Sequence, residues 1–287
     1  MPLVLGDRDF GDDEMLVMAI VNRTPDSFYD RGATFHDSEA LERVERAVAA
    51  GATLVDVGGV KAGPGDMVGV TEEIRRTAPF VAAVRERHAD LVISVDTWRA
   101  AVAREAVAAG ADLLNDTWSG ADPGLAEVAA EAGVGLVCCH VGPQTPRTRP
   151  HRVRYDDVVA DTVGRTTALA ERAVALGVRA DAVLVDPTHD FGKNTYHSLE
   201  VTRRLEELVA TGWPVLVSLS HKDFVGETLD LPIGERLTGT LAATAVTAWL
   251  GARVFRAHEV AETRQVLDMV ASIRGSRPPA VARRGLA

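Results

Sequence analysis

The feature that most constrains how this chain can fold is the alternation of short apolar runs with longer alanine-rich runs. Most of the short runs are almost continuously hydrophobic, as expected for parallel strands that are buried on both faces. The predicted strands are Leu16–Val21, Leu54–Val57, Leu91–Val95, Asp112–Asn115, Gly135–Cys139, Ala182–Val185, Pro214–Leu219 and Arg253–Arg256. The predicted helices are Ser38–Ala50, Glu72–His88, Arg99–Ala109, Gly124–Ala132, Asp157–Leu176, Tyr196–Ala210, Gly234–Leu250 and Glu259–Ser272.

Glycine follows several predicted helices and leads directly into the next strand, as at Gly51, Gly110 and Gly251. Glycine readily adopts the left-handed conformation that ends a helix, so these connections are predicted to be short. Eight strand–helix units in 287 residues fit a closed barrel, which needs roughly 250 residues. We therefore predict an α/β fold, a single (β/α)8 TIM barrel over residues 16–274, with an open doubly wound sheet as the alternative. Residues 1–15 are predicted to form an N-terminal extension and residues 275–287 a disordered tail.

The overall composition argues against some classes of binding partner. The formal net charge is −10, whereas nucleic-acid-binding proteins are usually basic, so no nucleic-acid partner is expected. No apolar run reaches the length of a membrane span, and the acidic N-terminal segment lacks the basic-then-apolar layout of a secretion signal. We therefore expect a cytoplasmic protein with no membrane partner. An anionic ligand would need local positive charge or a metal ion, because the overall field opposes it.

Polar residues follow the predicted strands, at the end of a barrel where active sites are built. The carboxylate and amide side chains are Asp96, Asn115 and Asp186, together with Asn22 after the first strand. The cationic and imidazole side chains are Lys222, Arg256 and His258, which follow the last two strands. Capping of helix N-termini could account for some Asp and Asn residues, but it does not account for the lysine, the arginine and the histidine.

These residue types indicate a ligand that carries both phosphate and a flat polar ring. Lysine and histidine donate to phosphate oxygens, arginine can grip two of them at once, and barrels often bind phosphate after the last two strands. Three acceptor side chains in the barrel mouth suit a heterocycle with several N–H donors, and internal pairing with backbone amides is the alternative. The amide oxygen of Asn22 suits a hard cation, so Mg2+ bound with a diphosphate is the expected cofactor.

Seven short motifs occur in register between residues 16 and 272. They are Asn22-Arg23-Thr24-Pro25-Asp26-Ser27-Phe28, Asp56-Val57-Gly58-Gly59, Ser94-Val95-Asp96-Thr97, Asn115-Asp116, Asp186-Pro187 with Phe191-Gly192-Lys193, Ser220 with Lys222, and Arg256 with His258. In kind and in order they resemble the motifs of the dihydropteroate synthase family. Each motif alone is weakly specific, whereas the whole series in register is specific.

The resemblance implies a reaction and a set of binding roles. The family joins 6-hydroxymethyl-7,8-dihydropterin diphosphate to p-aminobenzoate and releases diphosphate, on the route to folate. By this likeness, the residues expected to bind the pterin ring are Asp96, Asn115, Asp186 and Lys222. The residues expected to bind the diphosphate with Mg2+ are Asn22, Arg256 and His258, with Asn22 as the metal ligand. Family members are typically homodimers through their last helices, so a homodimer is expected.

The departures from the family pattern are concentrated where p-aminobenzoate would bind. The usual Glu-Ser-Thr-Arg after the paired glycines is Val60-Lys61-Ala62-Gly63 here, and the usual Gly-Ile-Gly-Phe-Gly-Lys is Thr188-His189-Asp190-Phe191-Gly192-Lys193. The serine that commonly meets the aminobenzoate carboxylate is replaced by Asp223, which would repel a like charge. Arg23 also stands where a small apolar residue is common. The altered second-substrate site therefore comprises Val60, Lys61, Ala62, Gly63, Asp190, Phe191 and Asp223.

These changes predict a dihydropteroate synthase-like protein that retains a pterin diphosphate site but has weak or absent synthase activity. Pterin diphosphate-type molecules and sulfa-like compounds are the expected ligands. Two alternatives stay open, a fully active dihydropteroate synthase and a transferase that uses a different acceptor. The roles of His189 and Asp190 also stay open between an acid–base pair and a pair on a surface loop.

Overall fold

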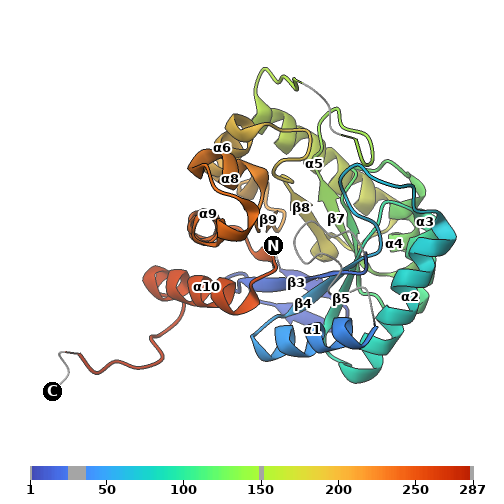
Figure 1. The fold of residues 1–287 in the computed structure, drawn as a ribbon, viewed down its shortest axis with the longest axis horizontal. Coiled ribbons are helices and arrows are strands. Elements are labelled where there is room, and N and C mark those ends of the chain that lie inside the picture. Colours follow the sequence, from blue (N-terminus) through green and yellow to red (C-terminus); the bar gives the residue numbers. More distant parts are fainter. Residues whose placement is uncertain (1, 25–36, 149–151, 285–287) are drawn as a thin grey trace.

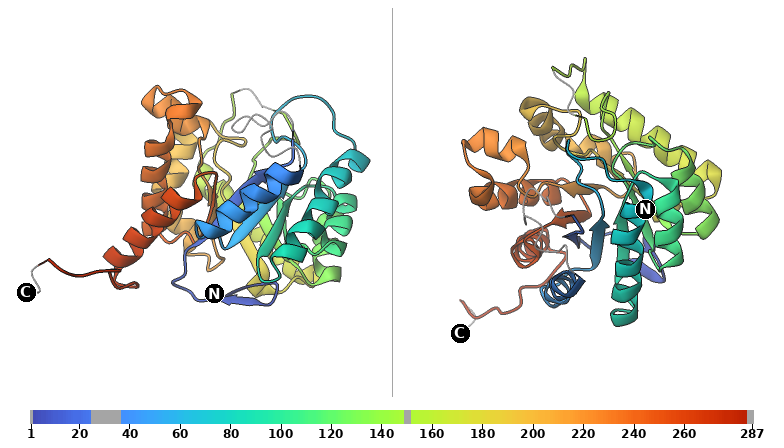
Figure 2. Two further views of the ribbon diagram at one scale, coloured as in Figure 1. Left: turned by 60° about the horizontal axis from the view of Figure 1, so that its bottom comes forward. Right: turned by 45° about the vertical axis from the view of Figure 1, so that its right-hand side comes forward.

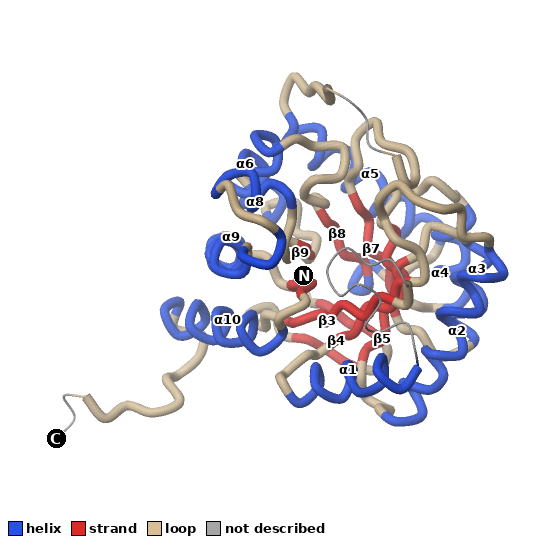
Figure 3. The backbone as a smooth tube through the Cα atoms, in the orientation of Figure 1, coloured by secondary structure: helices blue, strands red, loops and turns tan. Residues whose placement is uncertain are grey.

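The computed structural model describes residues 2–24, 37–148 and 152–284. Its centre is a ring of parallel strands with helices packed around the outside (Figure 1 and Figure 3). The strands of the ring are β3 (Leu16–Asn22), β4 (Leu54–Gly58), β5 (Val92–Asp96), β6 (Leu113–Asp116), β7 (Gly135–Cys139), β8 (Val183–Asp186), β9 (Leu216–Ser218) and β10 (Val254–Ala257). All are almost entirely buried, which explains why they are apolar on both faces.

The strands pair in parallel in the order β8-β7-β6-β5-β4-β3-β10-β9. The remaining edges, β8 and β9, are joined by a parallel bridge between Val185 and Val215. A hydrogen bond of 3.0 Å from the Val185 amide to the Pro214 carbonyl oxygen reinforces that bridge. The predicted single (β/α)8 TIM barrel is therefore confirmed, and the open doubly wound sheet is wrong because both edge strands find a partner.

The helices on the outside of the ring mostly follow the predicted ranges. They are α1 (Asp37–Ala49), α2 (Val70–Arg87), α3 (Ala100–Ala108), α4 (Gly124–Ala132), α5 (Val158–Leu176), α6 (Thr195–Arg203), α7 (Leu205–Val209), α8 (Asp223–Leu229), α9 (Leu237–Trp249) and α10 (Val260–Arg274), with short 3-10 turns at Ala180–Ala182 and Ile233–Glu235. The predicted continuous helix over residues 196–210 is wrong, because Arg204 takes φ −106° and ψ 25° between α6 and α7. Helix α8 was not predicted.

The N-terminal extension forms an antiparallel hairpin of β1 (Leu3–Leu5) and β2 (Arg8–Phe10). Its apolar side chains Leu3, Leu5 and Phe10 are buried in a cluster with residues from the starts of the barrel strands, such as Leu54 and Leu113. The hairpin therefore closes the N-terminal end of the barrel, opposite the end that carries the long loops (Figure 2, left). This closure leaves the other end as the open one.

The long loops lie at the C-terminal ends of the strands, where the segment after β4 arches over the barrel (Figure 2, left). Part of the first family motif, Pro25–Phe28, belongs to residues 25–36, which lie outside the described residues. Gly275–Arg284 contain neither helix nor strand. Among the described residues, no helix has the length and apolar character needed to cross a membrane.

Candidate functional site

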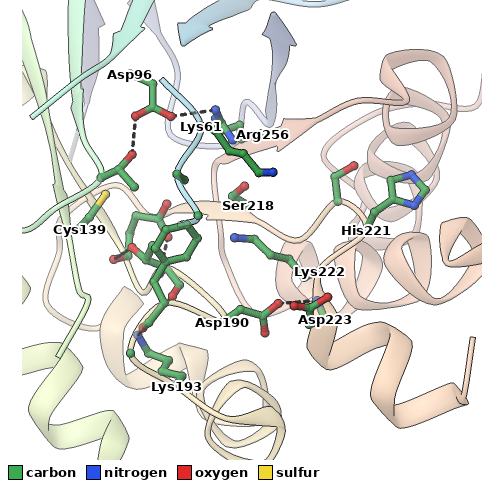
Figure 4. Close-up of a pocket in the computed structure, with 18 of the residues that line it drawn as sticks. Lys61, Asp96, Cys139, Asp190, Lys193, Ser218, His221, Lys222, Asp223 and Arg256 are labelled. Atoms are coloured by element: carbon green, nitrogen blue, oxygen red, sulfur yellow. Dashed lines mark hydrogen bonds and ion pairs between the residues drawn. The ribbon is translucent and has the colours of Figure 1, made fainter. Parts of the chain in front are cut away.

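A cavity of about 450 Å3 opens at the C-terminal ends of the strands (Figure 4). Every residue predicted for the site lines it: Asn22, Val60, Lys61, Ala62, Gly63, Asp96, Asn115, Asp186, Asp190, Phe191, Lys222, Asp223, Arg256 and His258. They converge because parallel strands of a closed barrel share one polarity, so their carboxyl ends meet at one rim.

One wall of the cavity is a buried network around Arg256. Its Nε donates to Asp56 Oδ2 at 2.6 Å and its Nη2 donates to Asp96 Oδ2 at 3.2 Å. The other oxygen of Asp96 accepts from Thr117 Oγ1 at 2.7 Å, and Asn115 Nδ2 donates to Asp56 Oδ2 at 3.2 Å. Burial raises the pKa of Asp96 to about 6, against the opposing attraction of Arg256. Arg256 is thus shared between two carboxylates before any ligand arrives.

A second group of polar residues comes from the ends of β8 and β9. Asp186 is buried and accepts from the Thr188 amide at 2.6 Å. Burial raises the pKa of Asp186 to about 6, while the Thr188 amide and Lys222 oppose that shift. The Lys222 ammonium lies 4.3 Å from the centre of the Phe191 ring and points into the cavity (Figure 4). This wall offers a carboxylate and a cation side by side.

His258 is buried at the edge of the cavity and its Nδ1 pairs with Ser220 Oγ at 2.9 Å. Burial lowers the pKa of His258 to about 3. The imidazole is therefore neutral at pH 7, so it can donate a hydrogen bond to a phosphate but adds no positive charge. Of the predicted diphosphate residues, only Arg256 carries a charge.

The two residues whose roles the sequence left open do not form a pair with each other. The Asp190 carboxylate accepts from the first amides of α8, Asp223 N at 2.5 Å and Phe224 N at 3.2 Å. His189 is buried, pairs through Nε2 with Thr202 Oγ1 at 3.0 Å and stacks on Phe224. Asp190 thus caps the N-terminus of α8, and His189 packs against Phe224 of the same helix. No described bond joins the two side chains, so the acid–base interpretation has no geometric support.

Lys193 is a site residue for which the sequence analysis predicted no role. Its buried ammonium donates to the carbonyl oxygens of His140 at 2.9 Å, Phe191 at 3.2 Å and Thr188 at 3.3 Å. Burial lowers the pKa of Lys193 to about 7. The lysine ties the loop after β8 to the loop after β7, and it holds the backbone carbonyl of Phe191. Its place in the Phe191-Gly192-Lys193 motif was the available signal.

The rewritten side of the cavity is acidic where α8 begins. Asp223 accepts from Arg236 Nη1 at 3.0 Å, and Glu227 accepts from the Thr195 hydroxyl. Both carboxylates line the cavity, and Glu227 was missed because α8 was not predicted. Arg23, the other departure, does not line the cavity, because its guanidinium lies 4.6 Å from the centre of the Phe80 ring and pairs with Asp37.

Comparisons with known proteins agree with this geometry. The family described as pterin binding enzyme matches residues 18–258. The chain is 62% identical over 291 residues to a Mycobacterium leprae protein named inactive dihydropteroate synthase 2, covering 100% of both chains. It is 37% identical over 255 residues to the Escherichia coli dihydropteroate synthase, covering 88% of this chain and 90% of that protein.

A solved structure matches as well. The Yersinia pestis dihydropteroate synthase in a sulfonamide drug complex superposes with a TM-score of 0.91 at 36% identity, covering 96% of this chain and 100% of that one. The sequence motifs, the closed barrel and the cavity at its C-terminal rim lead to the same assignment. The chain belongs to the dihydropteroate synthase family of pterin-binding enzymes.

Proposed function

We propose that the cavity binds a pterin diphosphate and that synthesis of dihydropteroate from it is weak or absent. The observation that carries this proposal is the contrast between the two sides of one cavity. The residues expected for the pterin and the diphosphate all line it, whereas the acceptor side is formed by Val60–Gly63 and by the carboxylates of Asp223 and Glu227. The name of the 62% identical relative, inactive dihydropteroate synthase 2, agrees with the proposal.

The pterin half offers complementary donors and acceptors at fixed positions. Asp186 and Asn115 are buried strand-end residues that can face the N–H donors of a flat heterocycle. Lys222 adds a donor, and the Phe191 ring beside it adds an aromatic surface. Because these groups are held before binding, little ordering is required when the ring enters.

The acceptor half opposes p-aminobenzoate electrostatically. A benzoate carboxylate that approached α8 would meet Asp223 and Glu227, and like charges brought together weaken binding. The usual threonine and arginine of the second loop are Ala62 and Gly63, which supply no side-chain donor. Each lost hydrogen bond to a charged group costs about 1.5–3 kcal/mol. Two or three such losses would lower catalytic efficiency by about a thousandfold or more.

Magnesium fits the diphosphate end as an ion that arrives with the ligand. Among the described residues, no three His, Cys, Asp or Glu side chains gather into a metal cage. The oxygens Asn22 Oδ1 and Asp96 Oδ2 both flank Gly58, at 3.8 and 3.9 Å from the point where a Cβ would stand. Mg2+ commonly takes one or two protein oxygens and completes its shell with substrate phosphates and water. We therefore infer that Asn22 holds a Mg2+ brought by the diphosphate.

Two other functions follow from the same cavity. A transferase with a different acceptor is favoured by the retention of Arg256 and Lys222 beside an acidic acceptor side, which would tolerate a neutral amine. A fully active dihydropteroate synthase would require that the rewritten loop still place p-aminobenzoate. The Yersinia pestis relative is solved in a sulfonamide drug complex, so sulfa-like compounds stay candidate ligands of the cavity here.

Calorimetric titration separates these functions. The protein is titrated with pterin diphosphate and Mg2+, and then with p-aminobenzoate, while diphosphate release is measured in parallel. We expect binding of the first ligand, no detectable binding of the second, and no aminobenzoate-dependent release. Turnover on the order of 10 s−1, a typical enzyme rate, would contradict the proposal. Diphosphate release that depends on another amine would favour a transferase with a different acceptor.

A homodimer is proposed through α9 and α10, which pack against each other. Their outer faces expose Val246, Trp249, Met269 and Ile273. Large apolar side chains gathered on neighbouring helices are typical of a protein–protein interface.

A further inference from the structure

Asp56 is a buried carboxylate of the second motif for which the sequence analysis predicted no role. It lies on β4 and has no exposed surface. Its neighbours Val55 and Val57 pack in the core between the strands and the surrounding helices. Because side chains alternate along a strand, Asp56 points the other way, into the interior of the barrel. A carboxylate in such a place is stable only when other groups donate hydrogen bonds to it.

Three side chains from three other strands donate to Asp56. Ser94 Oγ, on β5, donates to Asp56 Oδ1 at 2.6 Å. Arg256 Nε on β10 and Asn115 Nδ2 on β6 donate to Asp56 Oδ2 at 2.6 and 3.2 Å. Arg256 and Asn115 line the cavity, whereas Asp56 and Ser94 do not. Asp56 therefore holds two residues of the cavity wall from inside the barrel.

 The bond to Asp56 determines which end of the Asn115 amide is left for a ligand. An amide side chain has an NH2 group that donates and an oxygen that accepts, whereas a carboxylate accepts. The NH2 group of Asn115 therefore turns toward Asp56, and the amide oxygen turns toward Cys139, whose Sγ is 3.7 Å from it and which also lines the cavity. A thiol can donate or accept weakly, so Cys139 would tolerate either orientation of the amide.

The cavity wall then presents two acceptors, the amide oxygen of Asn115 and the carboxylate of Asp186. A pterin ring has neighbouring N–H donors on one edge, its 2-amino group and the adjacent ring N–H, and this edge suits two acceptors. In a lumazine ring the 2-amino group is replaced by an oxygen, so an acceptor of the ligand would meet an acceptor of the wall. A site whose buried polar groups are left unpaired by an analogue rejects that analogue strongly.

We propose that Asp56 is a positioning residue which, by fixing the orientation of the Asn115 amide, makes the cavity selective for 2-aminopteridines over 2-oxopteridines. The inference rests on the proposed pterin site and deepens it, because it names the residue that sets the hydrogen-bonding pattern offered to the ring. Asp56 acts through Asn115 and requires no contact with the ligand.

The test is calorimetric titration of the full chain with 6-hydroxymethylpterin and with 6-hydroxymethyllumazine, neither of which carries phosphate. The readout is the ratio of the two dissociation constants, because a variant that merely loosens the fold weakens both ligands and leaves their ratio unchanged. Asp56→Ala removes both acceptor oxygens, so the freed Asn115 amide can turn its NH2 group toward the lumazine oxygen. We expect the preference for the pterin to fall about tenfold, the range for one hydrogen bond.

Two further variants separate the acceptor role of Asp56 from its charge and its packing. Asp56→Asn can keep an oxygen toward Asn115 and turn its NH2 group to the Ser94 hydroxyl, so it should retain most of the preference. Ser94→Ala, the matched control, removes a buried bond to the same carboxylate and should leave the ratio unchanged. An unchanged ratio in Asp56→Ala, or a ratio in Asp56→Asn as low as in Asp56→Ala, would overturn the inference. Urea unfolding confirms that each variant is folded.

The inference and the proposed function fail in different ways. Failure of 6-hydroxymethylpterin to bind the wild-type protein would contradict the pterin site, whereas equal binding of the two pteridines would contradict the selectivity alone. Neutron diffraction of wild-type crystals tests the orientation of Asn115 without a ligand or a variant. We expect the deuterons of the amide on the atom that faces Asp56, and deuterons on the atom that faces Cys139 would overturn the inference.

Discussion

At the scale of single residues, the loop after β8 holds an unusual backbone. Thr188, Asp190 and Gly192 take φ values of 50°, 71° and 60°. Thr188 and Asp190 stand where the family pattern has glycine, so the loop keeps a left-handed shape after losing the residues that adopt it most easily. For a residue with a Cβ this conformation costs about 1–2 kcal/mol. The hydrogen bonds of Thr188 to Asp186 and of Asp190 to α8 offset that cost.

The cap formed by Asp190 should therefore be measurable. Replacing Asp190 with alanine leaves the first amides of α8 without their carboxylate, which should lower the free energy of unfolding by about 1–3 kcal/mol. Asp190→Asn should lose less, since asparagine tolerates positive φ and keeps one acceptor oxygen. Urea denaturation measures both, with Asp181→Ala, from an exposed pair with Arg179, as the control. A loss no larger than that of the control would contradict the assignment.

The buried carboxylate of Asp186 should make binding depend on pH. Burial raises the pKa of Asp186 from 3.8 to about 6, and the cations that face it are Lys222, Lys193 and Arg256. If the ionised form accepts hydrogen bonds from the pterin, affinity should fall as the pH drops below about 6, by at most tenfold per unit. Titration with phosphate-free pterin between pH 5 and 8 measures this. A flat profile, or the same profile in Asp186→Asn, would exclude the role of this carboxylate.

The raised pKa of Asp186 affects the stability of the folded protein in the opposite direction. The folded pKa of Asp186 lies above the ordinary value, so the folded protein holds this proton more tightly than the unfolded chain. The contribution of Asp186 to stability is then fully present below about pH 4 and is lost as the pH rises through about 6. The ionised form of Asp186, which is expected to bind the pterin best, is therefore the form that stabilises the folded protein least. Asp186→Asn should therefore remove a decline in stability between pH 4 and 7.

At the scale of elements, the hairpin and α8 determine which end of the barrel is open and what lines it. The hairpin fills the N-terminal end with Leu3, Leu5 and Phe10. Helix α8 stands beside the other end and supplies Asp223 and Glu227 to the cavity. Both are short, and neither has the long apolar period that predicts an element from sequence. Their stability comes from contacts with other elements of the barrel.

The hairpin offers a direct comparison between two neighbouring residues. Leu5 is fully buried against the barrel interior, whereas Val4 is on the opposite face of the same strand and only half-buried. Leu5→Ala should lower the free energy of unfolding by about 2–5 kcal/mol, because it leaves a cavity in a packed interior. Val4→Ala should cost clearly less. Equal losses in urea denaturation would mean that the hairpin does not plug the barrel.

At the scale of the whole molecule, the barrel separates two surfaces of different chemical character. The open rim carries the cavity, and the outer faces of α9 and α10 carry exposed apolar side chains. Trp249 and Met269 keep 56% and 62% of their surface exposed, and Val246 and Ile273 are exposed on the same two helices, so the apolar side chains form a group and are not scattered singly. A dimer formed through these helices would leave the rim accessible.

This arrangement predicts the effect of a charge on the proposed interface. Trp249→Asp should convert a dimer into a monomer, because burying a carboxylate against the apolar face of a second copy is unfavourable. Tyr196→Asp is the control, since Tyr196 is 81% exposed on α6, outside that surface. Sedimentation velocity or light scattering distinguishes the two states. A wild-type monomer, or an unchanged dimer in Trp249→Asp, would reject this interface.

The amino-acid sequence by itself determined the barrel fold and which residues lie at its C-terminal rim. Alternating strands and helices specify parallel pairing, and parallel strands bring their last residues to one end, so Asp96, Asn115, Asp186, Lys222 and Arg256 had to converge. Replacements such as Asp223 were equally visible, because they stand at fixed places within motifs. These features depend on local pattern and chain direction, which a sequence records directly.

Only the tertiary structure decided how those side chains are paired and charged. The sharing of Arg256 between Asp56 and Asp96 joins residues up to 200 positions apart in the chain, and the sequence contains no signal for it. The neutrality of His258 and the capping role of Asp190 likewise arise from burial and from neighbours on other elements. The physical reason is that desolvation and pairing are properties of the closed barrel, in which each side chain meets partners that its own segment does not supply.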